Sequence, residues 1–485
     1  MTFAGQWKTS KIGVLVLATS AVCSAVVTLV IMVSTARLPY QIDYEEGNVL
    51  NSAVRIVHGM PIYPAPHSWP SVINPYGPIG YEMVSWMVRL GGVELELPRL
   101  LMIGFTVICC VLIGFIVWRE IRSMAAAFAF GALLLSFGVV NSWAVNLRVD
   151  MIALAFSLAA IAVLAVRQKW WWVSAVLMVA AVFTKHTSLA APIACVLWLW
   201  LKGERKVALK MTGLAVALGV CGLAYMQWTT HGTFLFYMTG THPDFFLWRR
   251  YFEELYLHFT WNAVISALAL VAVVMTAVRR KLSLPVLYLL AATAMTVTIG
   301  KGGSSYNHLI ELSAAMCIAA GVGWYELTSA KDWKLSIAGT ALVLFLAATA
   351  VNNALHMKFR TRSNECDEAY TYVKNFRGER VVSVNLSMVV LAGKTLWISN
   401  PYVYTQLVKY GGWSDTDFQQ QLREHQVDLL MFNEDQEWSP EILKAVQQNY
   451  RIDQSFDCRE ATPNSLSAYV PKANKRSSAS SIPSP

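Results

Sequence analysis

The stretch that decides the fold is WWWVSAVLMVAAVFTKHTSLAAPIACVLWLWL, residues 170–201. Lys185 and His186 stand at its centre, with an apolar run of about fifteen residues on either side. As a single α-helix, these 32 residues would extend about 48 Å, whereas the hydrocarbon core of a membrane is about 30 Å thick. We therefore predict two short membrane-spanning helices that meet at Thr184–Thr187.

The composition of the whole chain is that of a membrane protein. Hydrophobic residues make up 55% of the 485 residues and charged residues 14%, whereas soluble chains carry about 25% charged residues. The apolar residues lie in long blocks, which excludes a disordered chain and a single soluble core. Further blocks of spanning or nearly spanning length are 12–36, 100–118, 123–147, 151–166, 211–230, 259–278, 282–300, 309–325 and 335–355. Together with the two halves of 170–201, they predict a polytopic all-α protein with about eleven transmembrane helices.

Basic residues indicate the orientation of these helices. With the split reading, the basic segments at 8–11, 119–122, 167–169, 202–206, 279–281 and 331–334 all fall on one side. The positive-inside rule makes that side the cytoplasm, whereas a single helix over 170–201 would send 279–281 outside. We therefore expect an integral protein of the plasma (inner) membrane with a cytoplasmic N-terminus. The net charge of +9 then reflects orientation and not nucleic-acid binding.

The first outer loop, residues 37–97, is more than a linker. Apolar residues at 50, 53, 54 and 57 recur at helical spacing beside polar ones, and the apolar stretch 79–90 is too short to cross. We expect both to form helices on the membrane surface.

After about residue 355 the composition becomes that of a soluble protein. β-like runs at 381–386, 395–398, 427–432 and 467–470 alternate with helical candidates near 415–424 and 440–449. We predict a transmembrane domain over 1–355, a small extracytoplasmic α/β domain over 356–471, and a disordered basic tail over 472–485. Cys366 and Cys458 are the only cysteines of the α/β domain, and whether they pair stays open, because the sequence gives no distance.

Ionisable residues gather on the predicted outer side. Acidic residues lie on the two early outer turns, at Asp43, Glu45, Glu46 and Asp150, and basic ones follow on the later turns, at Lys185, His186, Arg249, Arg250, Lys301 and His308. Charged side chains near the ends of membrane helices commonly extend into the membrane–water interface and have no further role. Acids and bases divided in this way on one side would also build a site with a general base and a clamp for an anion.

Several of these segments resemble motifs of the GT-C glycosyltransferases, and the similarity is closest to the bacterial family-39-like, lipopolysaccharide-core-type transferases. The resemblance rests on Asp43 with Glu45-Glu46-Gly47, on NPYGPIGY at 74–81, on Arg148-Val149-Asp150, on FTKHT at 183–187, and on GGSSYNH at 302–308 followed by Glu311. It covers residues 1 to about 330.

The resemblance implies a GT-C fold and an inverting transfer of a sugar from a polyprenyl-phosphate carrier to a glycan, lipid or protein acceptor at the extracytoplasmic face. By resemblance Asp43 is the catalytic base, because a carboxylate can accept the proton of the acceptor hydroxyl. Asp150 would orient the acceptor or raise the pKa of Asp43. Some relatives carry a second acid where Tyr44 stands here, so Glu45 or Glu46 would take that role.

The growing negative charge of the leaving phosphate needs cations. The six basic residues named above are the candidates, and Lys185 and His308 match motif positions. Tyr63, Tyr76, Tyr81 and Glu311 are candidate substrate contacts, although aromatic residues serve packing equally well. No metal-ligand spacing is present, and a divalent cation could be bound only if carboxylates of separate loops converge.

Two other functions fit a polytopic protein. A transporter or flippase of lipid-linked sugars would show inverted repeats and polar residues near the membrane midplane, but here the ionisable groups gather at one face. A sensor or assembly protein would use the spans only as anchors for the outer domain, and the acidic motif of the first loop would then have no purpose. The sequence leaves open the sugar, the acceptor, the oligomeric state and the role of the C-terminal domain.

Overall fold

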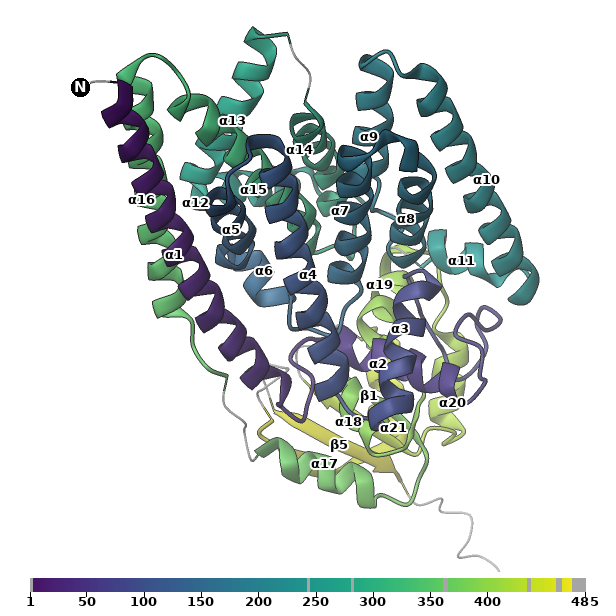
Figure 1. Ribbon diagram of the computed structural model, residues 1–485. Helices are drawn as coiled ribbons and strands as arrows, with labels where there is room; N and C mark the ends of the chain where they lie inside the picture. The colour runs from purple at the N-terminus through teal and green to yellow at the C-terminus, as the bar shows by residue number, and fades with distance from the viewer. Residues whose placement is uncertain are drawn as a thin grey trace, which may run out of the picture.

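The computed structural model describes residues 3–241, 245–280, 283–360, 365–433, 438–458 and 465–472. Long helices form a bundle, and a small domain with a five-stranded sheet packs against one end of it (Figure 1). The N-terminal helix begins at the other end of the bundle, away from this domain (Figure 1). Lys281 and residues 473–485, which include nearly all of the predicted disordered tail, lie outside the described residues.

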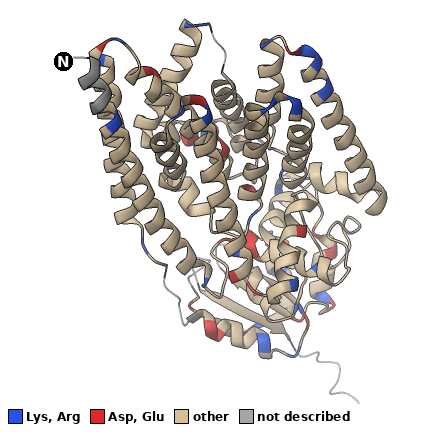
Figure 2. Cartoon of the chain, in the orientation of Figure 1, with Lys and Arg blue, Asp and Glu red and all other residues tan. Residues whose placement is uncertain are grey.

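Among the described residues, five helices are long and apolar enough to cross a membrane. They are α1 (Phe3–Ala36), α4 (Glu96–Ile121), α10 (Arg205–Thr229), α15 (Leu309–Thr328) and α16 (Trp333–His356). The pair α12 (Trp248–Trp261) and α13 (Ala263–Val278) passes the same test together, but is bent by 95°. Lys and Arg gather at the upper helix ends and around the lower domain, and most of the helical length between them is free of charge (Figure 2). The chain is an integral membrane protein.

The other predicted spans correspond to shorter apolar helices. They are α5 (Met124–Ala132) with η1 (Leu133–Ser136), α7 (Asp150–Val166), α8 (Trp171–Thr184), α9 (Ala190–Leu201), and α14 (Leu284–Met295) with η3 (Thr296–Gly300). The break predicted inside 170–201 is present, because α8 ends at Thr184 and α9 begins at Ala190. Lys185 and His186 lie in this break. The total of eleven spans stays a prediction.

Two predicted spans are interrupted. The helix expected over 123–147 stops at η1, Phe137 is extended, and α6 (Gly138–Trp143) follows. The Ser136 carbonyl accepts a hydrogen bond from the Asn353 amide and so has a partner outside the helix. The helix expected over 259–278 begins only at Ala263, since Asn262 leaves helical geometry and its side chain donates to the His258 carbonyl.

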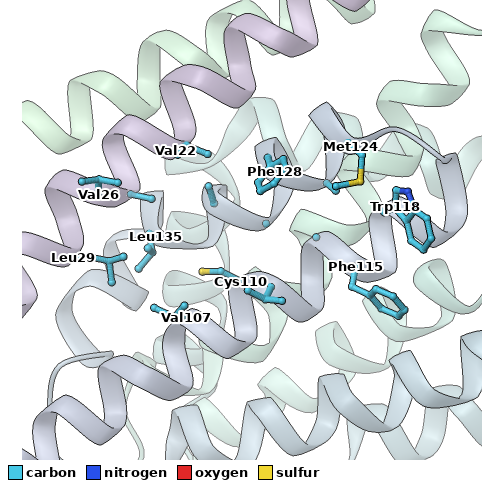
Figure 3. Close-up of a pocket in the computed structure, with 16 residues that line it drawn as sticks. Val22, Val26, Leu29, Val107, Cys110, Phe115, Trp118, Met124, Phe128 and Leu135 are labelled. Carbon is cyan, nitrogen blue, oxygen red and sulfur yellow. The ribbon is translucent and has the colours of Figure 1, made fainter.

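A groove between α1, α4 and α5 is lined almost wholly by apolar side chains. Val22, Val26, Phe115, Trp118, Phe128 and Leu135 are among the residues that line it (Figure 3). A surface of this kind is stable next to hydrocarbon chains and unfavourable in water. It therefore supports placing these helices in the membrane.

The first outer loop forms two helices as predicted, α2 (Tyr44–Val57) and α3 (Pro78–Gly91). Asp43 caps α2, and the Glu46 side chain accepts from the Asp43 backbone N–H in a capping box. α2 is covered, however, and does not lie open on a membrane surface. A Cβ atom on Gly47 would lie 2.4 Å from the Ser387 backbone nitrogen, so only glycine permits this close approach of the C-terminal domain.

The C-terminal domain has sheet order β2-β1-β3-β5-β4. Its elements are α17 (Glu365–Asn375), β1 (Arg380–Ser383), α18 (Leu386–Leu391), β2 (Thr395–Leu396), α19 (Pro401–Tyr410), α20 (Thr416–Arg423), β3 (Leu429–Asn433), α21 (Pro440–Asn449), β4 (Tyr450–Phe456) and β5 (Leu466–Pro471). β1 pairs in parallel with β2 and β3, whereas β5 pairs antiparallel with β3 and β4. A disulfide joins Cys366 to Cys458. The remaining short helices are η2 (Gln168–Trp170), α11 (Thr233–Thr239) and η4 (Tyr306–His308).

Candidate active site

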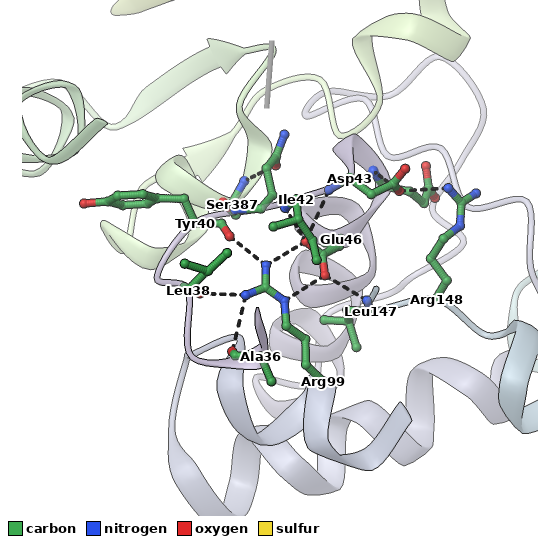
Figure 4. Close-up of polar contacts among 12 residues, drawn as sticks. Ala36, Leu38, Tyr40, Ile42, Asp43, Glu46, Arg99, Leu147, Arg148 and Ser387 are labelled. Atoms are coloured by element: carbon green, nitrogen blue, oxygen red, sulfur yellow. Dashed lines mark hydrogen bonds and ion pairs between the residues drawn. The ribbon is translucent and has the colours of Figure 1, made fainter. Parts of the chain in front are cut away.

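A buried ion pair anchors the acidic segment at residues 43–47 of the first loop, called the acidic hairpin below (Figure 4). Arg99 of α4 donates to Glu46 through Nε at 2.9 Å and Nη2 at 2.7 Å, and both side chains are fully buried. The Arg99 guanidinium also donates to the carbonyls of Leu38 and Tyr40, each at 2.6 Å. Burial alone would raise the pKa of Glu46, but Arg99 lowers it below its ordinary value. Glu46 therefore holds the hairpin in place as a carboxylate and has no free surface for a substrate.

Asp43 is placed by the same hairpin but keeps an accessible oxygen. Its Oδ1 accepts from Arg148 Nη1 at 2.8 Å and from the Glu45 backbone N–H at 3.1 Å (Figure 4). Both of these contacts reach Oδ1, and 14% of the Asp43 side chain is exposed. Burial raises the pKa of Asp43, Arg148 lowers it, and the neighbouring Glu46 adds to the rise. Asp43 thus offers one oxygen of raised basicity.

Arg148 connects Asp43 with the rest of the site. Its Nη2 donates to the Tyr76 hydroxyl at 2.8 Å, and its guanidinium lies 4.4 Å from the centre of the Trp143 ring. Its Nε lies 3.8 Å from Asp150 Oδ2. The guanidinium is therefore shared between two carboxylates.

Asp150 lies on the far side of Arg148, at the start of α7. Its Oδ1 accepts from Lys185 Nζ at 2.6 Å and from Asn307 Nδ2 at 2.8 Å. The carboxylate that raises the pKa of Asp43 is Glu46, and Asp150 instead pairs with Lys185. The contacts of Asp150 therefore do not support the expectation that it raises the pKa of Asp43, and its other expected role, orienting the acceptor, stays a prediction.

A small cavity of about 30 Å³ lies beside this network. Asp150, Lys185, Asn307, His308 and Glu311 line it. His308 Nδ1 is 2.8 Å from the Thr298 hydroxyl, and Glu311 accepts from Tyr288 at 3.2 Å. Lys185, from the break between α8 and α9, and His308, from η4, therefore both line the small cavity. The helix break and the late outer loop that the sequence singled out converge here.

The other predicted basic residues divide into two groups. Burial and the nearby charges of Lys185 and Lys301 lower the pKa of His186 to about 4, so its imidazole is neutral at pH 7. The exposed Lys301 therefore lies near the same cluster. Arg249 is exposed and pairs with Glu253 one turn along α12, and Arg250 follows it on that helix. No described contact joins Arg249 or Arg250 to the network around Arg148.

The predicted substrate contacts mostly pack inside the protein. The Tyr63 hydroxyl donates to the Tyr76 carbonyl at 2.6 Å, and its ring packs on Phe234. Tyr81 is fully buried. Of the four candidates, Tyr76 contacts Arg148 and Glu311 lines the small cavity.

Glu45 links the first loop to the C-terminal domain. It accepts hydrogen bonds from Asn48 and from Asn400, each at 2.8 Å, and burial raises its pKa to about 7. Asn400 caps α19 of the C-terminal domain, and no pattern in the sequence could have assigned it to the site. Arg148, by contrast, stands two residues before Asp150 in a recognised motif, and that position was the signal for it.

The sequence left a divalent cation open, and the carboxylates of the site pair with cations of the chain. Among the described residues no group of three or more His, Cys, Asp and Glu side chains is arranged to hold one. Asp43 pairs with Arg148 at 2.8 Å, and Asp150 pairs with Lys185 at 2.6 Å.

Comparisons with known proteins were made by sequence and by structure. No family model and no curated protein matches the chain. ArnT from Cupriavidus metallidurans without ligand superimposes with a TM-score of 0.62 and 12% identity, over 92% of this chain and 97% of that one. The same protein crystallised with undecaprenyl phosphate gives a TM-score of 0.59, at the same identity and coverage.

A second solved structure is AglB, the oligosaccharyltransferase of Archaeoglobus fulgidus, in complex with an inhibitory peptide and a dolichol-phosphate. It gives a TM-score of 0.53 at 10% identity, over 96% of this chain and 75% of that chain. Both proteins have the GT-C fold. The likeness extends over nearly the whole of this chain, so the protein has the GT-C fold that its sequence motifs resemble.

Proposed function

We propose that the protein is an inverting glycosyltransferase that moves a sugar from a polyprenyl-phosphate carrier to a hydroxyl-bearing acceptor at the extracytoplasmic face of the plasma membrane. The observation that carries the proposal is the pairing of an accessible basic carboxylate, Asp43, with a cluster of cations that begins at Arg148 and continues to Lys185. The two neighbours with this fold support it, because they were solved with undecaprenyl phosphate and dolichol-phosphate. The N-terminus would be cytoplasmic.

In this proposal the acceptor hydroxyl gives its proton to Asp43 Oδ2 while its oxygen attacks the sugar C1. The bond between C1 and the phosphate oxygen breaks, and polyprenyl phosphate leaves with the bonding electron pair. Attack from the face opposite the phosphate inverts the configuration at C1. Raised basicity suits Asp43 to this role, because it strengthens the drive to accept the proton.

Lys185, His308 and Arg148 would receive the leaving phosphate. Asp150 and Asn307 hold the Lys185 ammonium in position, so the cation is placed before the charge develops. Glu45 and Glu46 would act as positioning residues, because their carboxylate oxygens are already engaged by protein donors. A divalent cation has no place in this scheme.

Deletion of the gene tests the proposal. The deletion strain should accumulate an acceptor that is lighter by one sugar, which mass spectrometry of extracted envelope glycans and lipids would detect. The wild-type chain should restore the full mass, and Asp43→Asn should not. Glu82→Gln, which changes an exposed carboxylate of the same outer loop, is the matched control and should restore it.

Two results would refute the proposal. One is a deletion strain without any sugar-deficient product, and the other is full restoration by Asp43→Asn. If the protein were a flippase of lipid-linked sugars, the deletion strain would instead accumulate the donor lipid on the cytoplasmic leaflet.

A further inference from the structure

A second and larger cavity, of about 740 Å³, lies between α6, α12, the start of α15 and the end of α16. The polar residues that line it include Asn141, Ser142, Glu254, His258, Tyr306 and Asn353. α6 directly precedes the turn that carries Arg148, and α16 leads into the C-terminal domain. The cavity is therefore at the end of the bundle that carries the candidate active site.

Two buried polar atoms of this lining are without a partner in the described part of the chain. His258 is 5% exposed, and its Nε2 makes no hydrogen bond. Asn141 Oδ1 is in the same state. Buried polar groups are nearly always satisfied in native proteins, so the wall of this cavity holds two hydrogen-bonding atoms that the described residues leave unused.

The charge of the lining restricts the guest. No lysine or arginine is among the described residues that line this cavity, whereas Lys185 lines the small cavity beside Asp150. Amide, hydroxyl, imidazole and one carboxylate side chain offer donors and acceptors, and Tyr306 and Trp261 add aromatic rings. That combination suits an uncharged ligand with several hydroxyl groups and an apolar face, as a sugar ring has, and it provides no Lys or Arg charge for a phosphate.

The cavity adjoins the candidate site through two aromatic side chains. The Tyr306 ring meets the Trp143 ring edge to face at 5.2 Å, and Arg148 lies over the same Trp143 ring at 4.4 Å. Asn307, which bonds Asp150, is the next residue after Tyr306. Tyr306 and Trp143 therefore form a continuous contact from the lining of this cavity to Arg148.

We propose that this cavity binds a neutral sugar of the acceptor. This inference rests on the proposed transferase function, because only a transferase has an acceptor whose sugar could bind in this cavity. The source of the sugar is either a membrane lipid, since α12 and α16 border the cavity, or a soluble glycan.

Binding to the purified full-length protein in a sugar-free polyoxyethylene detergent tests this inference. The probes are the dodecyl glycosides of glucose, galactose and N-acetylglucosamine, with the matching methyl glycosides, titrated by microscale thermophoresis. We expect at least one dodecyl glycoside to bind, and Glu254→Gln and His258→Phe to weaken it at least tenfold. Glu253→Gln is the matched control, because Glu253 is next to Glu254 on α12 but pairs with Arg249 on the surface. It should bind as the wild type does.

The outcomes separate the source of the sugar. Tight binding of a methyl glycoside supports a soluble acceptor, whereas binding that needs the dodecyl chain supports a lipid-borne one. The inference is overturned if none of the probes binds, or if Glu254→Gln, at a half-buried position, and His258→Phe bind as well as the wild type. A separate titration with undecaprenyl phosphate, weakened by Lys185→Ala, tests the transferase proposal, so that either can fail without the other.

Discussion

Replacing Arg99 with glutamine should destabilise the protein strongly. The change leaves the Glu46 carboxylate fully buried without its bidentate partner, and it removes hydrogen bonds to the carbonyls of Leu38 and Tyr40. Breaking one side of a buried ion pair costs about 3–5 kcal/mol, because the other charge is left uncompensated. The double variant Arg99→Met with Glu46→Leu should lose less than Arg99→Gln does, since both charges are then gone.

The assay is equilibrium unfolding in mixed micelles of sodium dodecyl sulfate and dodecyl maltoside, followed by tryptophan fluorescence. Arg37→Gln is the control, because the Arg37–Glu96 pair at 3.5 Å has side chains 69% and 45% exposed, and such a pair contributes about 1 kcal/mol or less. Since the pKa of Glu46 is held below its ordinary value of 4.5, the stabilisation is full at pH 7. It should be lost as the pH falls below about 4.5. Equal losses for Arg99→Gln and Arg37→Gln would refute this account of the hairpin.

Three further predictions follow from the contacts of the C-terminal domain. The pKa of Glu45 is about 7 in the folded protein and 4.5 in its ordinary state, so the free energy of unfolding should fall by about 3 kcal/mol as the pH rises from 4.5 to 7. Glu45→Gln should abolish this dependence on pH. An unchanged dependence in the variant would contradict the assignment to Glu45. Gly47→Val should displace the domain through a clash with Ser387 and so speed its cleavage by added trypsin, whereas an unaltered cleavage rate would argue against the close approach. Replacing Cys366 and Cys458 by serine should cost the domain about 2–5 kcal/mol, measured by pulse proteolysis, and a loss below 1 kcal/mol would contradict this.

The fold was accessible from the sequence wherever a physical signal was local. Lys185 and His186 in the middle of an apolar run predict the break between α8 and α9, because a charge in the membrane needs an exit or a partner. The interruptions at Phe137 and Asn262 were not predicted, since they depend on side-chain hydrogen bonds to backbone carbonyls, from Asn353 to Ser136 and from Asn262 to His258, rather than on composition. β4 was missed for a different reason: it is an edge strand with five successive exposed residues, and it lacks the alternation by which strands are recognised.

The candidate site shows the same division. The sequence singled out Asp43, Asp150, Lys185 and His308 because they stand beside turns with recognisable motifs, and their roles stay predictions. The inert role of Glu46 depends on Arg99, which lies 53 residues away, and charge type alone does not separate a clamped carboxylate from an accessible one. Asn400 comes from another domain, so only the assembled structure reveals its contact with Glu45.

That contact has a consequence for how the protein matures. Glu45 precedes its partner Asn400 by 355 positions, and the long apolar helix α16 lies between them in the sequence. The carboxylate of Glu45 must therefore stay uncovered until the C-terminal domain has been made. A chain whose synthesis stops before this point would have the helical bundle but not the residue that covers Glu45, so the first loop is completed only by the domain that is made later.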